Sequence, residues 1–470
     1  MRQAARYADS WVSLRARTQR IPGVQVAVAV AGDVLLSSAH GYARLPETND
    51  AGDTGEPLTT QHLFRIASHS KTFTATAVLQ LVEAGRLRLD DTVGQHVPAL
   101  ADSPIADRTL AELLAHGGGV VRDSHEAGFW QLEREFPDGD GLLAACRDAS
   151  DVLERNERFK YSNIGYGVLG LVVEAASGRS FADYVAGEIL ERLGLHRTGP
   201  ELDAARAGEY ATGYSSLAAY DRRLPIDPVD TRALASATGF WSTAGDLCRY
   251  AAGHVLGEER LLSDAGKRRM QRGEWDVEGT DERYGLGLGI YTVGERRMVG
   301  HGGGFPGYIT RTLLDPADGL TVVVLTNAID GPALALTKGI VRLVDEALEA
   351  ARGSSEQPIG DAASYTGRFA ALWGVTDIVD LGGRLRLVDP NRPDPTEELG
   401  TLQVVDADTL RIEDDTGYAA PGEQVRYLRS DDGTTSSVVI GGVTAVPIDT
   451  HVDALRGLDR ISLGGPHAAG

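Results

Sequence analysis

The chain has 470 residues, of which 42% are hydrophobic and 24% charged, and its 46 basic and 67 acidic residues give a formal charge of −21. The length exceeds that of a typical single domain and the composition is ordinary for a soluble globular protein, so we expect two domains. Because such a negative surface repels nucleic acid and anionic membranes, neither is expected as a partner.

The N-terminal segment does not have the pattern of an export signal. Met1 to Tyr7 carries cationic residues, but no apolar run follows, and no later segment reaches the length needed to span a bilayer. The only two cysteines, Cys146 and Cys248, offer no disulfide framework. We therefore expect a cytoplasmic protein, an expectation that a removed signal peptide would reverse.

Ser68-His69-Ser70-Lys71 is the first motif with chemical content, and it follows strand-like runs at 24–30 and 34–39. The apolar spacing from Thr72 to Ala84, closed by Gly85, predicts a helix directly after it. A lysine three residues beyond a serine on one helical face can reach the hydroxyl and remove its proton. Ser68 is therefore the candidate nucleophile and Lys71 its candidate base.

A second motif, Tyr161-Ser162-Asn163, precedes an apolar run from Ile164 to Ala176 that predicts a buried helix. Tyr161 and Asn163 are two residues apart in the entering loop, so both side chains can face one cleft. A phenol beside a lysine ammonium ionises more easily, and a buried lysine loses its proton more easily.

The third motif, His301-Gly302-Gly303-Gly304, lies between strand-like runs at 297–300 and 308–314. Glycine in an edge strand lets a substrate backbone approach closely, and a bare amide there can serve as an oxyanion donor. Further strand-like runs at 284–293 and 320–326, and a helical pattern at 332–351, complete this part of the chain.

In this order and at these separations, the three motifs resemble those of the serine β-lactamase and D-alanyl-D-alanine peptidase superfamily. The resemblance is to the branch with class C β-lactamases, D-aminopeptidases and related esterases, and it covers roughly residues 10 to 350. Leu113 to Gly119 and Gly239 to Leu247 are similar to two shorter family motifs. The resemblance implies that Ser68 is acylated, while Lys71 and Tyr161 share proton transfer.

The same resemblance implies further roles at the site. The backbone amides of Ser68 and Gly304 would form the oxyanion hole, and Asn163 would bind the substrate amide. His301, Gly302 and Gly303 would line the substrate-binding site. No cofactor is expected, and the scattered histidines, the absence of H-E-x-x-H and the cysteine spacing argue against a metal.

The third motif departs from the penicillin-hydrolysing pattern, which has lysine-threonine-glycine where His301-Gly302-Gly303 stands here. A lysine is a permanent cation suited to a substrate carboxylate, whereas a histidine is mostly neutral near pH 7. The change argues against β-lactam hydrolysis. A histidine at this position resembles the motif of the D-aminopeptidases and esterases of the family. The alternative is that His301 only supports the strand by packing.

Three other residues compete for functional roles. His116 and the glycines after it could form an oxyanion loop of the α/β-hydrolase kind, but no G-x-S-x-G is present, so a structural turn is expected. Ser70 would point away from Lys71 on a helix. His69 also faces another way, which indicates exposure or packing.

We expect residues 1–352 to form the hydrolase-like domain, 353–361 a linker, 362–455 a small antiparallel barrel or half-barrel, and 456–470 a tail. Gly382-Gly383 and Asp431-Asp432-Gly433 each predict a hairpin. Tyr365 to Phe369 resembles the opening of the lipocalin-like domain found in D-aminopeptidase-type relatives. A generic β accessory domain is the alternative.

The expected fold class is α/β (α+β): an antiparallel sheet built from both ends of the domain and flanked by helices, plus the C-terminal β-barrel. The expected function is that of a serine hydrolase acting on a small-molecule or short-peptide substrate, as a D-aminopeptidase or a carboxypeptidase-like enzyme. The alternatives are an esterase on small acyl esters, then a β-lactamase, and, from another class, a non-catalytic penicillin-binding-like sensor or scaffold. A homo-oligomer is left open.

Overall fold

The computed structural model describes residues 1–46, 54–148, 150–353, 362–414, 420–456 and 458–461. The chain divides into two compact units, Ala16–Thr337 and a second unit that combines Met1–Arg15 with Lys338–Gly470. Most of the expected linker at 353–361 and of the expected tail at 456–470 lies outside the described residues.

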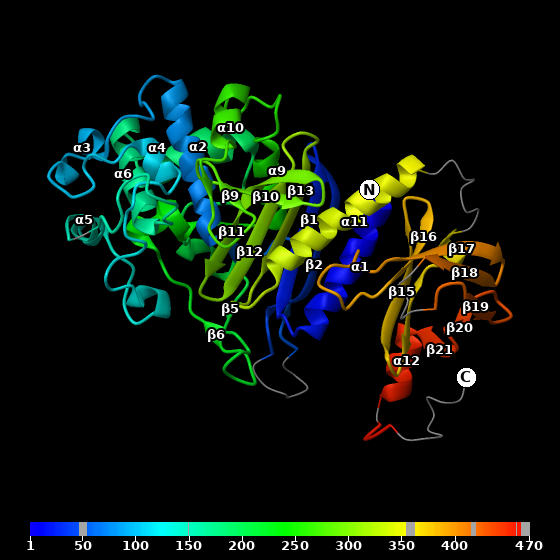
Figure 1. The fold of residues 1–470 in the computed structure, drawn as a ribbon. Helices are drawn as coiled ribbons and strands as arrows, with labels where there is room; N and C mark the ends of the chain where they lie inside the picture. The colour runs from blue at the N-terminus through cyan, green and yellow to red at the C-terminus, as the bar shows by residue number, and fades with distance from the viewer. Residues whose placement is uncertain (47–53, 149, 354–361, 415–419, 457, 462–470) are drawn as a thin grey trace. The chain divides into compact units, whose positions relative to one another are not determined.

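The larger unit contains a nine-stranded sheet in the order β3-β2-β1-β13-β12-β11-β10-β9-β8 (Figure 1). Its middle strands come from opposite ends of the unit, since Val24 pairs with Thr326. Strand β13 is buried along its whole length, which agrees with its run of β-branched residues. The strands are β1 (Gly23–Val30), β2 (Asp33–Arg44), β3 (Glu56–Pro57), β8 (Trp275–Asp276), β9 (Arg283–Tyr284), β10 (Gly289–Val293), β11 (Arg296–Phe305), β12 (Tyr308–Leu314) and β13 (Leu320–Thr326).

Two parts of this sheet differ from the expected runs. The run at 284–293 is interrupted between β9 and β10, where Gly287 has a positive φ of 80° and its amide donates to the Leu114 carbonyl. The glycine motif is not a gap between strands but lies inside β11, where Gly302 pairs with Arg311 and Gly304 with Ile309. Neighbouring strands therefore hold a segment whose own β-propensity is low.

Helix α2 (Ser70–Glu83) is the central helix of this unit and packs against α6 (Asn163–Ser177). It ends as expected, with Gly85 at a positive φ of 70°. The buried hydroxyls of Thr72 and Thr76 donate to carbonyls one turn earlier, so the helix satisfies its own polar side chains. Other helices are α3 (Val93–His96), α4 (Leu110–Leu114), α5 (Gly139–Arg147), α7 (Phe181–Val185), α8 (Glu191–Leu193), α9 (Ala244–Ala252) and α10 (Asp264–Met270).

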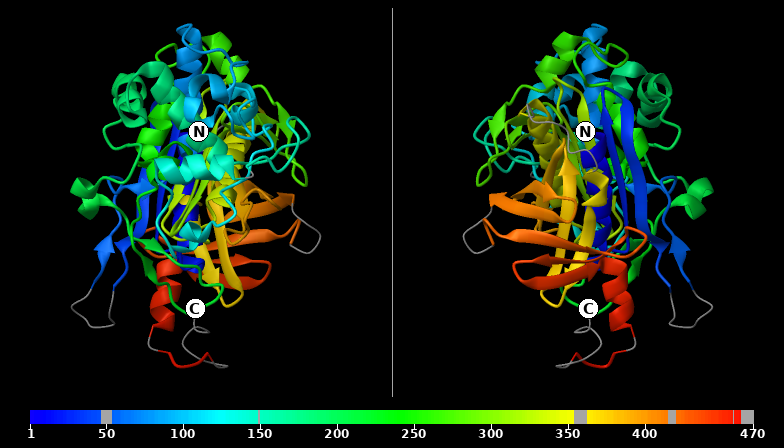
Figure 2. Two further views of the ribbon diagram at one scale, coloured as in Figure 1. Left: turned by 90° about the vertical axis from the view of Figure 1, so that its left-hand side faces the viewer. Right: turned by 90° about the vertical axis from the view of Figure 1, so that its right-hand side faces the viewer.

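The smaller unit is a closed eight-stranded antiparallel barrel, seen in yellow to red in Figure 2. Alternate residues of its strands fill the interior, and Phe369, Ile378 and Val438 lie in that core. Both expected hairpins are present. The strands are β14 (Gly367–Ala371), β15 (Gly374–Leu381), β16 (Arg384–Val388), β17 (Gly400–Asp406), β18 (Thr409–Asp414), β19 (Gln424–Arg429), β20 (Thr435–Ile440) and β21 (Val443–Pro447).

The barrel unit also contains parts of two helices, α1 (Arg2–Thr18) and α11 (Ala333–Gly353), and the whole of α12 (Ile448–Leu455). Within the unit, Tyr7 Oη donates to Asp377 Oδ2 at 2.9 Å, and Trp11 Nε1 donates to the Pro390 carbonyl at 3.1 Å. Arg368 pairs with the same Asp377. The N-terminal residues are therefore bound to the barrel by specific polar contacts.

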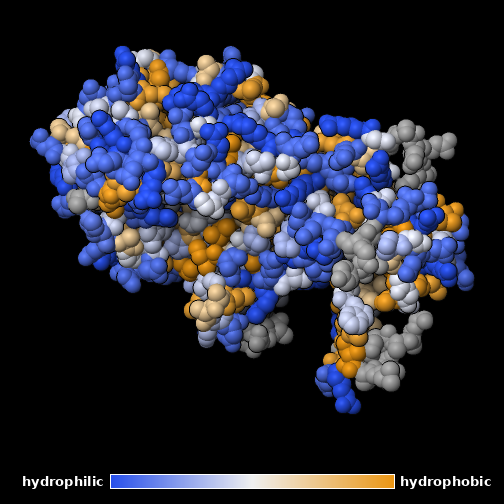
Figure 3. Space-filling view, viewed as in Figure 1, coloured by the Kyte–Doolittle hydropathy of each residue, from blue (hydrophilic) through white to orange (hydrophobic). Residues whose placement is uncertain are grey.

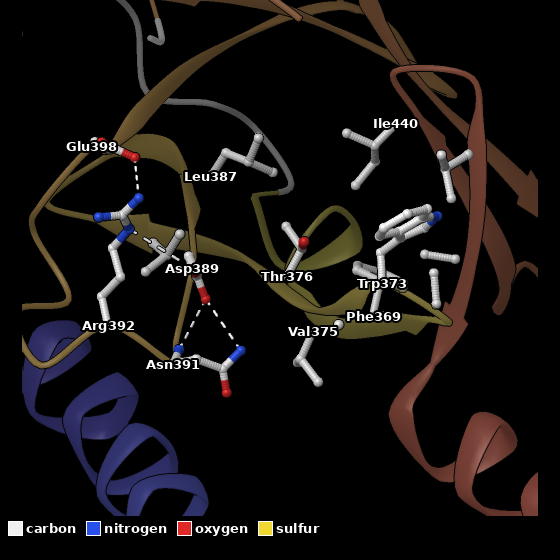
Figure 4. A pocket seen from close by; sticks show the side chains of 15 residues that line it. Phe369, Trp373, Val375, Thr376, Leu387, Asp389, Asn391, Arg392, Glu398 and Ile440 are labelled. Atoms are coloured by element: carbon white, nitrogen blue, oxygen red, sulfur yellow. Dashed lines mark hydrogen bonds and ion pairs between the residues drawn. The ribbon is translucent and has the colours of Figure 1, made fainter. Parts of the chain in front are cut away.

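One end of the barrel has a pocket of about 500 Å³ between the β14–β15, β16–β17 and β20–β21 connections. Figure 4 shows Phe369, Trp373 and Ile440 on its apolar side, and Asp389 and Arg392 on its polar side. The outer surface displayed in Figure 3 is mostly hydrophilic, with apolar residues in separate groups, as the formal charge of −21 leads one to expect.

The architecture confirms the expected fold class: a large antiparallel sheet with flanking helices, and a closed β-barrel. The choice between a barrel and a half-barrel, which the sequence left open, is resolved as a barrel. None of the helices in the described part of the chain is long and apolar enough to cross a membrane.

Candidate active site

Ser68 lies in the tight turn that precedes α2. It is the middle residue of a 3-10 turn (Ala67–His69), and α2 begins two residues later, at Ser70. Ala67 has a positive φ of 50°, an uncommon conformation for a residue with a side chain. Ser70 stabilises this turn, because its hydroxyl donates to Ala67 O at 2.6 Å and accepts from the Phe240 amide. Strained backbone held in this way is a common feature of functional sites.

The Lys71 side chain is completely buried below the Ser68 hydroxyl. Its Nζ lies 3.3 Å from Ser68 Oγ, and it donates to Asn163 Oδ1 at 2.7 Å and to the Ala237 carbonyl at 2.8 Å. That carbonyl belongs to a π-helical turn, Ala235–Gly239. Burial lowers the pKa of the Lys71 amine well below its usual range, while the Asp123 charge opposes this effect.

Tyr161 contacts the nucleophile from the other side. Its hydroxyl donates to Ser68 Oγ at 2.7 Å, and its ring centroid lies 4.7 Å from Lys71 Nζ. Burial raises the pKa of this phenol, which outweighs the opposite effect of the Ser68 hydrogen bond. This direction is opposite to the easier ionisation expected from a neighbouring lysine, because desolvation is the larger effect. Tyr161 is therefore a neutral hydrogen-bond donor in this arrangement.

Asn163 is the first residue of α6 and bridges Lys71 to Asp123. Asp123 was not among the site residues predicted from the sequence. Asn163 Nδ2 donates to Asp123 Oδ1 at 2.6 Å. Trp130 Nε1 donates to the same oxygen at 2.9 Å, and Arg122 Nε donates to Asp123 Oδ2 at 3.1 Å. Asp123 comes seven residues after His116, so the family-like turn at 113–119 was the one available signal for its location.

The glycine motif lines the cleft on strand β11. A methyl group added at Gly303 would meet the Ile66 carbonyl oxygen at 2.1 Å, so a side chain there would separate β11 from the turn that carries Ser68. Ser68 and Gly304 share the wall of a hollow of about 420 Å³. The bare backbone of Gly304 is therefore next to the nucleophile, where an oxyanion donor is needed.

His301 is buried, with Nε2 3.1 Å from Tyr284 Oη and Nδ1 against the carbonyl of Gly302. Burial lowers the pKa of this imidazole well below its ordinary value, and the nearby Lys71 acts in the same direction. The ring is therefore neutral near pH 7. It lines a second hollow, of about 370 Å³, together with Gly302 and Tyr161.

Arg311 is a cation in this second hollow that the sequence did not predict. It is opposite Gly302 on strand β12, and a methyl group added at Gly302 would meet its guanidinium carbon at 2.7 Å. Its Nη1 donates to Tyr291 Oη at 2.8 Å, while its Nε is buried without a hydrogen-bond partner among the described residues. A missing lysine at position 301 therefore does not leave the cleft without a positive charge.

The competing candidates lie outside the reacting group. His69 is buried, with Nε2 3.0 Å from Thr312 Oγ1, and burial lowers the pKa of its imidazole to about 3. His116 Nδ1 accepts from the Ser162 amide at 3.1 Å, so it supports the turn next to α6. Among the described residues, no group of three His, Cys, Asp or Glu side chains could hold a metal ion.

The geometry brings together a serine hydroxyl, a buried amine, a neutral phenol and a bare strand amide, which is the set of groups that nucleophilic acyl transfer requires. The sequence model of the family described as Beta-lactamase matches residues 8–344. Penicillin-binding protein 4 of Amycolatopsis lactamdurans is 29% identical over 343 residues, which are 69% of this chain and 85% of that protein.

Solved structures with a similar fold include the octameric penicillin-binding protein homologue from Pyrococcus abyssi. It has a TM-score of 0.64 and 22% identity, covers 94% of this chain and 99% of its own, and shows a likeness of fold. The crystal structure of SurE with D-Leu has a TM-score of 0.58 and 25% identity, with the same coverage of 94% and 99%.

Proposed function

Because this chain belongs to the beta-lactamase family, we propose that it is a serine hydrolase that forms an acyl-enzyme on Ser68 and cleaves small peptides or amides. One observation carries the proposal: Ser68 Oγ is 2.7 Å from Tyr161 Oη and 3.3 Å from Lys71 Nζ. A hydroxyl between a buried amine and a neutral phenol has both the base and the acid that acyl transfer needs.

The hydrogen bonds of Lys71 suit the role of base. A neutral amine has two N–H groups, and Asn163 Oδ1 and the Ala237 carbonyl accept two hydrogen bonds from it. Its lone pair is then directed at the third neighbour, Ser68 Oγ. Burial favours the neutral amine because it lowers the pKa of Lys71.

In the first half-reaction, Ser68 Oγ attacks the substrate carbonyl while its proton passes to Lys71. The amides of Ser68 and Gly304 stabilise the oxyanion that forms. When the C–N bond breaks, the leaving amine takes a proton that Tyr161 relays from Lys71. Water then attacks the ester, gives its proton to Lys71, and the C–O bond to Ser68 breaks as the serine regains a proton.

Two observations bear on the substrate. The related SurE structure with D-Leu, 25% identical to this chain, supports a D-residue in the substrate. Arg311 in the cleft supports a substrate with a free carboxylate, as in carboxypeptidase-like cleavage, because a guanidinium binds carboxylates well. An esterase acting on small acyl esters is the second candidate, since the same acyl-enzyme chemistry processes esters.

The test is the intact mass of the protein after rapid acid quench with a small nitrophenyl ester, with nitrophenol release followed in parallel. Ser68→Ala should lose both the adduct and the release while its thermal midpoint stays nearly unchanged. Ser177→Ala, at a half-buried serine at the end of α6, is the matched control and should retain both. D- and L-aminoacyl amides, with and without a free carboxylate, then separate peptidase from esterase.

Adduct formation and release in Ser68→Ala would remove Ser68 as the nucleophile. Neither signal in well-folded wild-type protein, across the ester and the amides, would favour the binding scaffold over the enzyme.

A further inference from the structure

A buried carboxylate lies behind the candidate base. Asp123 is 7% exposed and sits in the loop that runs along the start of α6, where the Arg122 carbonyl accepts from the Asn163 amide at 2.7 Å. The neighbouring Val121 carbonyl accepts from the Ser162 hydroxyl at 2.7 Å. The loop is therefore bound to the same helix start that carries Asn163, which fixes the position of the carboxylate.

Asp123 determines which way the Asn163 amide faces. A carboxylate only accepts hydrogen bonds, so the NH₂ group of Asn163 must turn toward it, and the amide oxygen must turn toward Lys71. The Trp130 indole also donates to Asp123 Oδ1, which holds the carboxylate in place. With the amide reversed, two acceptors would meet at Asp123 and an amide donor would compete for the lone pair of Lys71.

We propose that Asp123 is a positioning residue of this site, which orients the Asn163 amide toward Lys71 and, through its negative charge, sets the pH at which the Lys71 amine becomes a base. This inference rests on the proposed function, because it concerns the activation of Ser68. Asp123 acts through Asn163 and Lys71, not by contact with the reacting atoms.

The charges around Lys71 give the sign of the expected effect. Asp123 favours the ammonium form, and Arg122, whose exposed side chain pairs with Asp123, favours the neutral form. Removing the Asp123 charge should therefore lower the titration midpoint of Lys71, and removing the Arg122 charge should raise it. The titratable and charged groups that face Lys71 are Asp123 and Arg122 from the 121–123 loop, Tyr161 and Tyr166 from the region of α6, His116 after α4, and His301 on β11.

The chain is well suited to a direct titration because it contains only four lysines, Lys71, Lys160, Lys267 and Lys338. Protein labelled with [¹³Cε]lysine gives one signal for each, and loss of a signal in Lys71→Met assigns that of Lys71. Asp123→Asn keeps the size and the hydrogen-bonding oxygen but removes the charge. Arg122→Gln removes the opposite charge from an exposed side chain.

Asp123→Asn should lower the titration midpoint of Lys71 by on the order of one pH unit, and Arg122→Gln should raise it. The rate at which a fluorophosphonate labels Ser68 should follow, with its acid limb at lower pH in Asp123→Asn and at higher pH in Arg122→Gln. Asp246→Asn is the matched control, a buried aspartate at the start of α9 that pairs with Arg249. It should leave both midpoints unchanged.

The two readouts separate two kinds of failure. Wild-type protein that a fluorophosphonate does not label at any pH would count against the proposed function. Labelled wild-type protein, together with an unchanged Lys71 midpoint and an unchanged acid limb in Asp123→Asn, would overturn the electrostatic role of Asp123, because the variant loses the charge and keeps the oxygen that accepts from Asn163. If Asp123→Asn does not fold, an unshifted midpoint in Arg122→Gln would overturn the electrostatic part on its own.

Discussion

Replacing Lys71 by methionine should make the stability of the larger unit less dependent on pH. In the unfolded chain the Lys71 amine has its ordinary pKa of 10.5, whereas burial lowers the pKa well below that value in the folded protein. Between the two pKa values the unfolded chain binds one more proton than the folded protein. Wild-type stability therefore rises with pH through this window, and is lost as the pH falls from 10.5 toward the folded pKa.

The size of the effect follows from one proton. Each pH unit inside the window changes the free energy of unfolding by about 1.4 kcal/mol. Two measurements about 1.5 pH units apart within the window should therefore differ by about 2 kcal/mol. Methionine also leaves Asn163 Oδ1 and the Ala237 carbonyl without their donor, at a cost of about 1–3 kcal/mol each. Because that cost does not vary with pH, it shifts the curve of the variant without changing its slope.

Urea unfolding of wild type and Lys71→Met, followed by tryptophan fluorescence from pH 6 to about pH 11.5, measures the difference. Within the window, the slope of unfolding free energy against pH should differ between the two proteins by about 1.4 kcal/mol per pH unit. Above pH 10.5 the two curves should run parallel. Lys160→Met, at a lysine outside the site, is the control and should follow the wild type. Parallel curves for Lys71→Met over the whole range would refute a buried amine that is neutral in the folded protein.

Tyr161→Phe removes the hydroxyl that donates to Ser68 and should lower kcat by about 100-fold or more with little change in KM, as steady-state kinetics would reveal; an unchanged kcat would exclude the phenol from proton transfer. Arg311→Gln should raise KM about tenfold for substrates with a free carboxylate and leave their amide-capped forms unchanged, and an equal effect on both would show that Arg311 does not bind the carboxylate. Gly303→Ala should lower the thermal midpoint and abolish acylation, because its methyl group would meet the Ile66 carbonyl. We expect the free energy of unfolding to fall by about 1–3 kcal/mol. Gly304→Ala, where the nearest atom is 3.5 Å away, is the control for the thermal midpoint; equal losses of stability in both variants would contradict the packing argument.

The parts of the fold that the sequence predicted are those with local patterns. The helix after Lys71, the helix after Asn163 and most strands follow from apolar spacing and from glycine at helix ends. The proximity of Ser68 and Lys71 also follows from a spacing of three residues. For these features no long-range information is needed.

The parts that could not be predicted depend on tertiary contacts. Lys71 donates to the Ala237 carbonyl directly and is linked to Asp123 only through Asn163. Neither Ala237 nor Asp123 belongs to the three motifs that the sequence offered. The direction of the Tyr161 pKa depends on burial, which a sequence does not reveal. The left-handed conformation of Ala67 is stabilised by the Ser70 hydroxyl, which donates to the Ala67 carbonyl and accepts from the Phe240 amide. The residue type of Ala67 does not indicate this conformation.

The pairing of β1 with β13 has a consequence for biosynthesis. Val24 leaves the ribosome about 300 residues before its partner Thr326, and at roughly 5–20 residues per second this takes at least about 15 seconds. During that time β2 covers one edge of β1, while the edge that later pairs with β13 is open to foreign strands. Loop closure over so long a segment is also slow. A permuted chain whose new ends lie in an exposed loop of the helical region, with the old ends joined, would bring β13 out before β1 and shorten this exposed interval.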